Sequence, residues 1–258
     1  LAQNLLHGVF SSGEAPNFPP ETFRTPGYPL FILAAGAALK HPSFSIALVQ
    51  SILGALTSVA AWGWLNGRTS RKGALIGFLY LALDPVILFH TPLLLSETLF
   101  TGLMLWALCA QWATFEKPTS GSALGAGLAW SAGAFVRPVA VYFPLLICAL
   151  WRGSRKTLLV FIAAFFFLPA LWIARNQRAT GHAIFSSVGG VSLLRYPAAG
   201  IESLRTGEPW SVVDKQLRES AGRPPSGFYA NDADLSAAYG KAAAPILMAH
   251  PFLLARHC

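Results

Sequence analysis

Charged residues are scarce in this sequence. Only 12% of its 258 residues are Asp, Glu, Lys or Arg, whereas a soluble domain usually carries about 25%. Hydrophobic residues make up 54%, and the mean hydropathy is +0.50. The charged residues are too few to supply the polar surface of a water-soluble chain of this length. The composition therefore predicts an all-α fold, that of a polytopic integral membrane protein.

Acidic residues are the scarcest charged group, and they are unevenly distributed. Six of the 11 acids lie between Glu202 and Asp234, and the net charge is +8. The basic residues occupy short loops between apolar runs. This pattern is typical of membrane topology signals rather than of nucleic-acid binding. We therefore expect membrane lipids, and no nucleic acid, among the partners.

Cysteine is also rare and forms no recognisable site. Cys109 and Cys148 lie inside apolar runs and Cys258 is the last residue, so the spacing indicates neither a metal site nor a disulfide framework. The chain begins at Leu1 in the middle of a pattern, without a start methionine or a signal peptide. We expect it to be a fragment of a longer protein.

Long apolar runs dominate the rest of the chain. A helix needs roughly 17–25 apolar residues to cross a bilayer. The run at 122–151 contains Arg137-Pro138 in its middle, and this proline favours two short helices that meet there. The sequence then predicts about six transmembrane helices, at 44–65, 73–90, 93–115, 122–151 (two) and 157–174, and the start of a further one within 245–258.

The basic loops predict the orientation. Arg68, Arg71 and Lys72 follow the first run, and Arg152, Arg155 and Lys156 precede the 157–174 run, so both loops should be cytoplasmic. An apolar segment at 29–39 is too short to cross and should lie on the membrane surface. The predicted domains are a first external loop (1–43), a transmembrane domain (44–174), an external loop (175–244) and the further segment (245–258).

Two acids lie within or beside the apolar runs, where a charge is costly. Glu97 stands at the outer start of a span. It is either a carboxylate that reaches an external site, as a base or a metal ligand, or a helix N-terminal acid favoured by the helix dipole, with Ser96 near the cap. Asp84 precedes Pro85 in mid-span, and we favour a structural kink there over a buried relay.

Several cations are expected on the same outer side. Arg137 could hold a phosphate through its guanidinium or extend to lipid headgroups. Arg24 could bind a lipid phosphate, or it could make a headgroup contact next to a turn formed by Pro26 and Gly27. Tyr28 is either part of that site or an interfacial anchor. Arg175 follows the 157–174 run, where it could bind an anion or satisfy helix-end carbonyls. His90, at an outer helix end, is the one histidine near the other candidates.

The order of these segments is informative. The motifs RTPGYPLF (24–31), LSETLF (95–100), Arg137-Pro138, and Trp172 followed by Arg175 and Asn176 together resemble the GT-C superfamily of glycosyltransferases. The nearest likeness is to bacterial members of the dolichyl-phosphate-mannose protein mannosyltransferase and aminoarabinose transferase group. The resemblance covers nearly the whole chain and is strongest over residues 1–176.

The resemblance implies that a sugar moves from a polyprenyl-phosphate donor to a lipid, glycan or protein acceptor at the outer face of the cell membrane. Glu97 matches an acidic position of the family, and Arg24 and Arg137 are candidates for the carrier phosphate. The family's main catalytic aspartate would lie upstream of Leu1, because Glu14 and Glu21 are poor substitutes. This chain alone should then be inactive. A divalent metal would be compatible with the superfamily, whose members differ in this respect.

Two other functions remain open. A lipid or solute transporter, or flippase, should have polar residues near mid-bilayer and paired discontinuous helices, and only Asp84 fits that description. A structural subunit of a membrane complex should tolerate the loss of its external charges.

Overall fold

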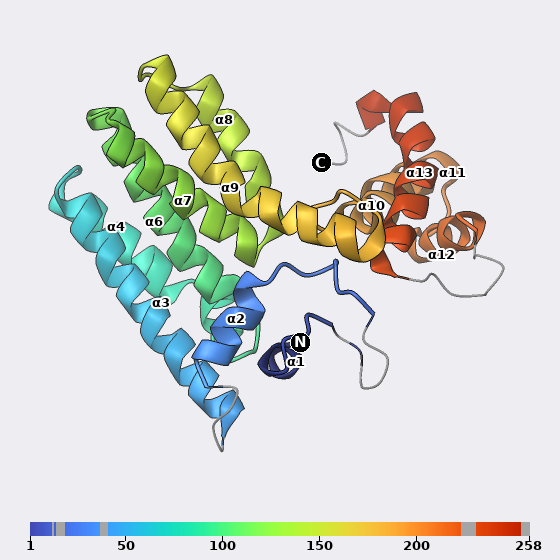
Figure 1. The fold of residues 1–258 in the computed structure, drawn as a ribbon, viewed down its shortest axis with the longest axis horizontal. Helices are drawn as coiled ribbons and strands as arrows, with labels where there is room; N and C mark the ends of the chain where they lie inside the picture. The colour runs from blue at the N-terminus through green and yellow to red at the C-terminus, as the bar shows by residue number, and fades with distance from the viewer. Residues whose placement is uncertain (12, 14–18, 37–40, 223–230, 254–258) are drawn as a thin grey trace. The chain divides into compact units, whose positions relative to one another are not determined.

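The computed structural model describes residues 1–11, 13, 19–36, 41–222 and 231–253. In these residues the regular secondary structure is helical and no strand is present, which confirms the all-α class. The chain divides into two compact units (Figure 1). The first unit contains Leu1–Val9 and Thr25–Trp172, and the second contains Phe10–Arg24 and Ile173–Cys258.

The first unit holds the long apolar helices. The last of its helices, α9, continues along the chain into the second unit. The bounds are α1 (Ala2–Leu6), α2 (Gly27–Ala34), α3 (Pro42–Asn66), α4 (Arg71–Leu83), α5 (Pro85–His90), α6 (Glu97–Glu116), α7 (Ser120–Val136), η1 (Pro138–Tyr142), α8 (Phe143–Ala149) and α9 (Arg155–Thr180).

Four helical segments are long and apolar enough to cross a membrane. They are α3, the α4–α5 segment, α6 and α9, and each reaches the length that a bilayer core requires. This finding fits an α-helical membrane protein. Helix α7 and the Pro138–Ala149 segment are shorter, so the expected number of six spans stays a prediction.

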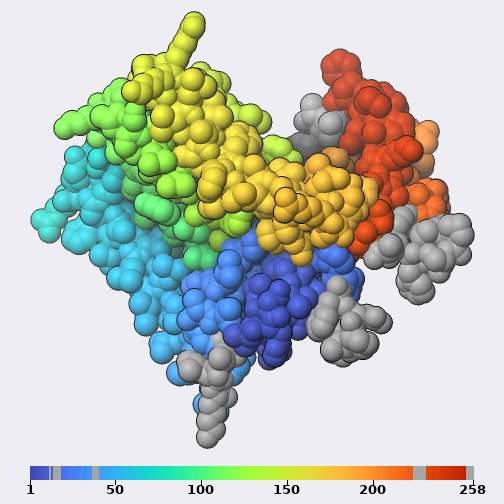
Figure 2. Space-filling model, in the orientation of Figure 1, coloured from blue at the N-terminus to red at the C-terminus, as the bar shows by residue number. Residues whose placement is uncertain are grey.

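The first unit exposes many large apolar side chains and buries many small ones. The side chains of Phe44, Ile76 and Tyr80 are 70%, 68% and 70% exposed, as expected for side chains that face lipid. Small residues instead allow helices to approach closely. At Gly127 of α7, a Cβ atom would lie 2.6 Å from the carbonyl oxygen of Phe161 in α9. The space-filling view shows α3 and α4 (cyan) against α6 and α7 (green) (Figure 2).

The predicted kink at Asp84-Pro85 is confirmed. Helix α4 ends at Leu83 and α5 begins at Pro85. The Oδ1 atom of Asp84 accepts hydrogen bonds from the backbone amides of Val86 and Ile87, at 2.8 and 3.0 Å. The carboxylate therefore caps α5, which explains an acid at this position in structural terms.

The predicted break at Arg137-Pro138 is confirmed as well. Helix α7 ends at Val136, and Pro138 begins the short helix η1. The turns that join α3 to α4, α6 to α7 and α8 to α9 lie at the same end of the first unit (Figure 1). At that end Arg68 pairs with Glu116 at 3.7 Å. The two basic loops thus share one end, as the orientation argument requires, and the start of α6 lies at the other.

Two predicted segments differ from the observed helices. The run at 93–115 starts four residues before α6, because the carbonyl oxygens of Thr91 and Leu93 turn toward the side-chain amide of Gln50. The surface segment predicted at 29–39 forms a helix over Gly27–Ala34, and its residues 37–39 lie outside the described residues.

The second unit contains four short helical segments and the longer helix α13. The glycine at 190 lets α10 lie against α13, where its backbone amide donates to Ser236 Oγ at 3.2 Å. Leu194, Ala198 and Ala243 form a buried core. Much of the predicted 175–244 loop is thus helical, and residue 245 lies inside α13. The bounds are α10 (Val188–Leu193), η2 (Leu194–Ala198), α11 (Ala199–Thr206), α12 (Trp210–Ser220) and α13 (Asp232–Ala249).

Candidate functional site

Glu97 and Arg137 form an ion pair in the first unit. Helices α6 and α7 are an antiparallel hairpin, so the first residue of α6 lies beside the residue that follows α7. The Nη1 atom of Arg137 donates to Oε1 of Glu97 at 3.0 Å. Two sequence-predicted site residues that are 40 positions apart are therefore in direct contact. We call them the Glu97–Arg137 pair.

The pair keeps unused hydrogen-bonding capacity. Among the described residues, Oε2 of Glu97 is buried without a hydrogen-bond partner, and Nε and Nη2 of Arg137 donate to nothing. The guanidinium carbon lies 5.6 Å from the centre of the Phe100 ring. The Arg137 side chain is 41% exposed. A partly exposed guanidinium with free donors can bind an anionic oxygen, and a planar one does so best with a phosphate or a carboxylate.

The expected place of Ser96 near the helix cap is confirmed. Ser96 does occupy the N-cap position of α6, but its side chain makes no capping hydrogen bond. Glu97 lies in the first turn, where the helix dipole favours a negative charge. The carboxylate also pairs with Arg137, so Glu97 is a helix N-terminal acid that forms an ion pair. Its role in an external site stays a prediction.

Tyr28 lies within electrostatic range of Glu97 and makes a specific hydrogen bond. Its hydroxyl donates to Oε1 of Gln50 at 3.0 Å. Burial, and secondarily the charge of Glu97, raise the pKa of Tyr28 to about 12. The phenol therefore stays protonated at neutral pH and can act as a donor. Within the described residues, the hydrogen bond from Tyr28 positions the side chain of Gln50.

Gln50 is a functional candidate that the sequence reasoning missed. It is fully buried in the middle of α3. Its side-chain Nε2 donates to the carbonyl oxygens of Thr91 and Leu93, both at 3.1 Å. These bonds hold the turn that precedes Glu97. The sequence does contain a signal for this residue, because a side-chain amide inside a largely apolar span needs a hydrogen-bond partner.

His90 is not brought to the pair. Its Nδ1 atom lies 2.6 Å from the carbonyl oxygen of Val86, one turn earlier in α5. The imidazole packs edge-on against the neighbouring Phe89 ring, with 5.5 Å between the ring centres. Among the described residues His90 makes no hydrogen bond or ion pair with Glu97 or Arg137. The geometry gives it a role in ending α5.

Arg175 belongs to the second unit and stabilises a loop there. Helix α9 continues past it to Thr180, so Arg175 is not at a helix end as the sequence suggested. Its guanidinium donates to the carbonyl oxygens of Glu21 and Phe10, at 2.8 and 3.2 Å, and to Oδ1 of Asn176 at 2.9 Å. These bonds fix the segment before α2 onto α9 within the second unit.

Arg24 lies in the same unit and shares Glu21 with Arg175. Its side chain is 61% exposed, and its Nη1 atom lies 3.5 Å from Oε2 of Glu21. Glu21 is buried, and its Oε1 accepts the backbone amides of Phe23 and Arg24 at 2.8 and 3.0 Å. Sequence reasoning set Glu21 aside as a residue of a Pro-rich loop, yet it organises that loop. Glu14 lies outside the described residues.

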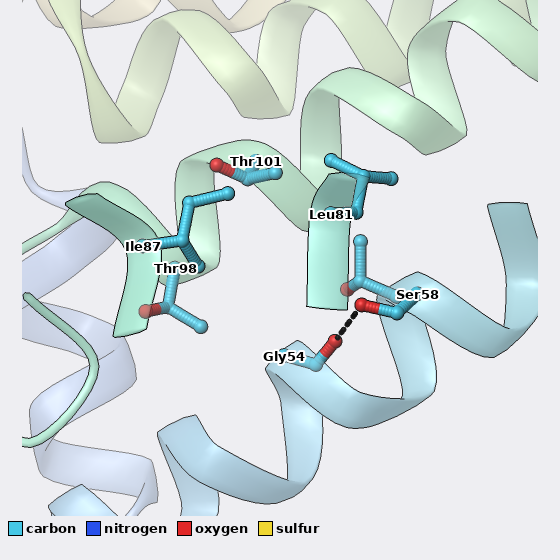
Figure 3. Close-up of a pocket in the computed structure, with 7 residues that line it drawn as sticks. Gly54, Ser58, Leu81, Ile87, Thr98 and Thr101 are labelled. Atoms are coloured by element: carbon cyan, nitrogen blue, oxygen red, sulfur yellow. Dashed lines mark hydrogen bonds between the residues drawn. The ribbon is translucent and has the colours of Figure 1, made fainter. Parts of the chain in front are cut away.

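A small cavity lies between α3, α4, α5 and α6 (Figure 3). Its lining includes Ser58, Thr98 and Thr101, and it has room for about one water molecule. Ser58 Oγ donates to the carbonyl oxygen of Gly54 at 3.1 Å, and Thr101 Oγ1 donates to that of Glu97 at 2.9 Å. Hydroxyls that bond their own helices in so small a space do not form a sugar site.

The described residues offer no set of metal ligands. In the part of the chain covered by the structure, no three side chains of His, Cys, Asp or Glu lie together so that they could hold a metal ion. The chemistry of the first unit therefore centres on the Glu97–Arg137 pair and the hydroxyl of Tyr28.

Comparison of the chain with protein-family models, with curated proteins and with solved structures found no match in any of the three.

Proposed function

We propose that this chain is a membrane glycosyltransferase, a multi-pass protein of the inner or plasma membrane that transfers a sugar from a polyprenyl-phosphate donor to an acceptor at the outer face. The observation that supports the proposal best is the Glu97–Arg137 pair. It joins the LSETLF motif to the Arg137-Pro138 motif, on which the resemblance rests. The pair also lies at the end of the first unit opposite to the basic loops, where an external site is expected.

Arg137 is the proposed phosphate ligand. When the acceptor attacks the anomeric carbon, the bond from that carbon to the phosphate oxygen breaks, and the oxygen keeps the electron pair. The acceptor proton passes to a carboxylate base. The free Nε and Nη2 donors of Arg137 would stabilise the charge that develops on the leaving phosphate.

Glu97 suits a positioning role better than the role of base. Its Oε1 is engaged by Arg137, and its Oε2 is buried. An acceptor hydroxyl cannot reach a buried oxygen without movement of the pair. We therefore propose that Glu97 orients the guanidinium, and that the base is a separate aspartate, as the resemblance implies.

Sugar transfer by the intact protein in membranes tests this proposal. Arg137→Ala should lower turnover by about 10²-fold, as for the loss of a donor to a developing negative charge, and Arg137→Lys should recover part of it. Glu97→Gln should lower the rate less than Arg137→Ala. Arg71→Ala, at the opposite end of the first unit, is the matched control and should leave the rate unchanged. Wild-type turnover in both Arg137→Ala and Glu97→Gln, at normal protein levels, would exclude the site.

A transporter is the second candidate, and the broken α4–α5 segment favours it, because discontinuous helices often line transport sites. The Asp84 carboxylate, however, is already bound to the amides of α5. Uptake of a labelled lipid-linked sugar by sealed vesicles, with loss of uptake in Asp84→Asn and retention in Arg137→Ala, would support transport over transfer.

A further inference from the structure

A second site lies at the other end of the first unit. The last turn of α6 and the residues that follow α8 form an open cleft of about 410 Å³, a size typical of small-molecule sites. It lies at the end of the basic loops, where Arg68 pairs with Glu116. The lining residues are Trp112, Phe115, Glu116, Leu150 and Arg152.

The two charges in the cleft are not equivalent. The Glu116 carboxylate is engaged, since it accepts a hydrogen bond from Trp112 Nε1 at 2.7 Å and pairs with Arg68 at 3.7 Å. Arg152 is exposed and, among the described residues, makes no hydrogen bond or ion pair. The unsatisfied charge in the cleft is therefore positive.

The surroundings of the cleft are positive as well. Glu116 is the single acid in the three loops and helix ends at this end of the unit. A negatively charged ligand is favoured by such a field, and each basic residue near an anionic membrane surface adds to the attraction. The cations in these segments are Arg68, Arg71, Lys72, Lys117, Arg152, Arg155 and Lys156.

The walls of the cleft are aromatic and apolar. Trp112 lies edge-on to Trp64, with 5.9 Å between the ring centres, and Phe115 lies edge-on to Trp151 at 6.1 Å. Leu150 is 67% exposed. Tryptophan is enriched at the level of lipid headgroups, where a ring can meet both polar and apolar neighbours. A ligand that fits these walls has an anionic group joined to an apolar body.

We propose that this cleft binds one anionic phospholipid. The phosphate would contact Arg152, while the glycerol and the first methylene groups would pack against Trp112, Phe115 and Leu150. An ammonium headgroup is disfavoured, because the charge of Glu116, the acid that could receive it, is already paired with Arg68 and the remaining charge of the cleft is positive. The site is at the opposite end from the Glu97–Arg137 pair, and it does not depend on the proposed transferase function.

Native mass spectrometry of the detergent-solubilised protein tests this site, with phosphatidylglycerol as the probe and phosphatidylcholine and phosphatidylethanolamine for comparison. Phosphatidylglycerol should bind most tightly. Arg152→Ala should weaken its binding about fivefold, the effect of one cation at an anionic lipid surface. Arg155→Ala removes a nearby charge outside the cleft and is the matched control. Leu150→Trp fills the cleft without changing the charge and should also reduce binding.

Three results would overturn the proposal. The first is equal binding of phosphatidylglycerol and phosphatidylcholine. The second is an equal loss in Arg152→Ala and Arg155→Ala, which would indicate a diffuse charge effect. The third is unchanged binding in Leu150→Trp, which would place the lipid outside the cleft. Melting temperatures of the three variants, measured in the same detergent, show whether each is folded.

Discussion

Arg137 donates a hydrogen bond of 3.0 Å to Glu97. Glu97 is the first residue of a helical hairpin and Arg137 follows its last residue, so the contact joins the start of the hairpin to its end. The contact follows from chain geometry. Helix α6 has 20 residues and α7 has 17, so a short turn between them returns the chain to the level of its start. The hairpin thus places an acid and a cation together at its open end, where each charge lowers the energetic cost of burying the other.

The first prediction concerns the energetic coupling within this pair. Removing Arg137 leaves the Glu97 carboxylate, which is 29% exposed, without its charged partner. We expect Arg137→Gln and Glu97→Gln each to lower the free energy of unfolding by about 1 kcal/mol, with a double variant that loses clearly less than the sum. Thermal unfolding in detergent, at low and high salt, measures all four proteins.

An additive double variant would show that the pair contributes no interaction energy in the folded state. Arg71→Gln serves as the control, because Arg71 lies at the opposite end of the first unit and makes no ion pair among the described residues. Its combination with Glu97→Gln should be additive.

The sequence predicts the local breaks in this fold well. Prolines at 85 and 138 remove backbone donors, and each marks the boundary at which a helix ends and the next begins. The exposed apolar faces also follow from composition. The start of α6 does not follow from composition. It depends on Gln50 in α3, whose side-chain amide donates to two carbonyl oxygens of the turn before α6.

The candidate site is predicted only in part, and the reason is the range of the interactions. Helix pairing in a short hairpin brings Glu97 and Arg137 together, whereas periodicity and loop charge predict only that both lie on the outer side. Arg175 instead bonds to Glu21, 154 positions away, and no local pattern announces such a contact. Charge alone therefore predicts that Arg175 belongs with the outer cations. In the structure its guanidinium donates hydrogen bonds to Glu21, Phe10 and Asn176 in the second unit.

The second prediction tests the close packing of α7 against α9. A Cβ atom at Gly127 would lie 2.6 Å from the Phe161 carbonyl oxygen and 2.7 Å from Ala164 Cβ, whereas one at Gly125 would meet nothing within 4 Å. Gly127→Ala should therefore lower the free energy of unfolding by about 1–3 kcal/mol. Gly125→Ala should be neutral or stabilising by up to about 1 kcal/mol, since it removes a flexible residue from a helix. Equal unfolding temperatures for the two variants would contradict the packing described here.

The third prediction compares two buried glutamines of the long helices. Gln50 bonds to Tyr28, Thr91 and Leu93. Among the described residues, both side-chain polar atoms of Gln111 lack a partner. Gln50→Leu should destabilise by about 2–3 kcal/mol, because it leaves the Tyr28 hydroxyl and the turn carbonyls unpaired. Gln111→Leu should be neutral or stabilising, because it removes buried polar atoms that have no bond. Thermal unfolding in one detergent measures both, and the reverse order would refute the bonding of Gln50.

The fourth prediction is a pH dependence in the second unit. Burial, and then the charge of Glu21, raise the pKa of Asp232, while Arg24 opposes them. A raised carboxyl pKa means that the folded state favours the protonated form. Its contribution to stability is complete below the ordinary pKa of aspartate, about 3.9, and is lost as the pH rises through the folded-state pKa.

Asp232→Asn should therefore be more stable than the wild type at pH 7, and this advantage should disappear as the pH falls below about 4. The gain should stay under about 1 kcal/mol, because the side chain keeps contact with solvent and the N-terminus of α13 favours a negative charge.

Asp234→Asn is the contrast, since Asp234 pairs with His182 at 2.8 Å and with Asn231 at 2.9 Å, and its loss should destabilise. Hydrogen exchange of α13 amides between pH 4 and pH 8 measures both variants against the wild type, after correction for the intrinsic exchange rate. A stabilisation by Asp232→Asn that persists undiminished at pH 4 would contradict a titrating carboxylate, because a carboxyl group with a raised pKa takes up its proton as the pH falls toward that value.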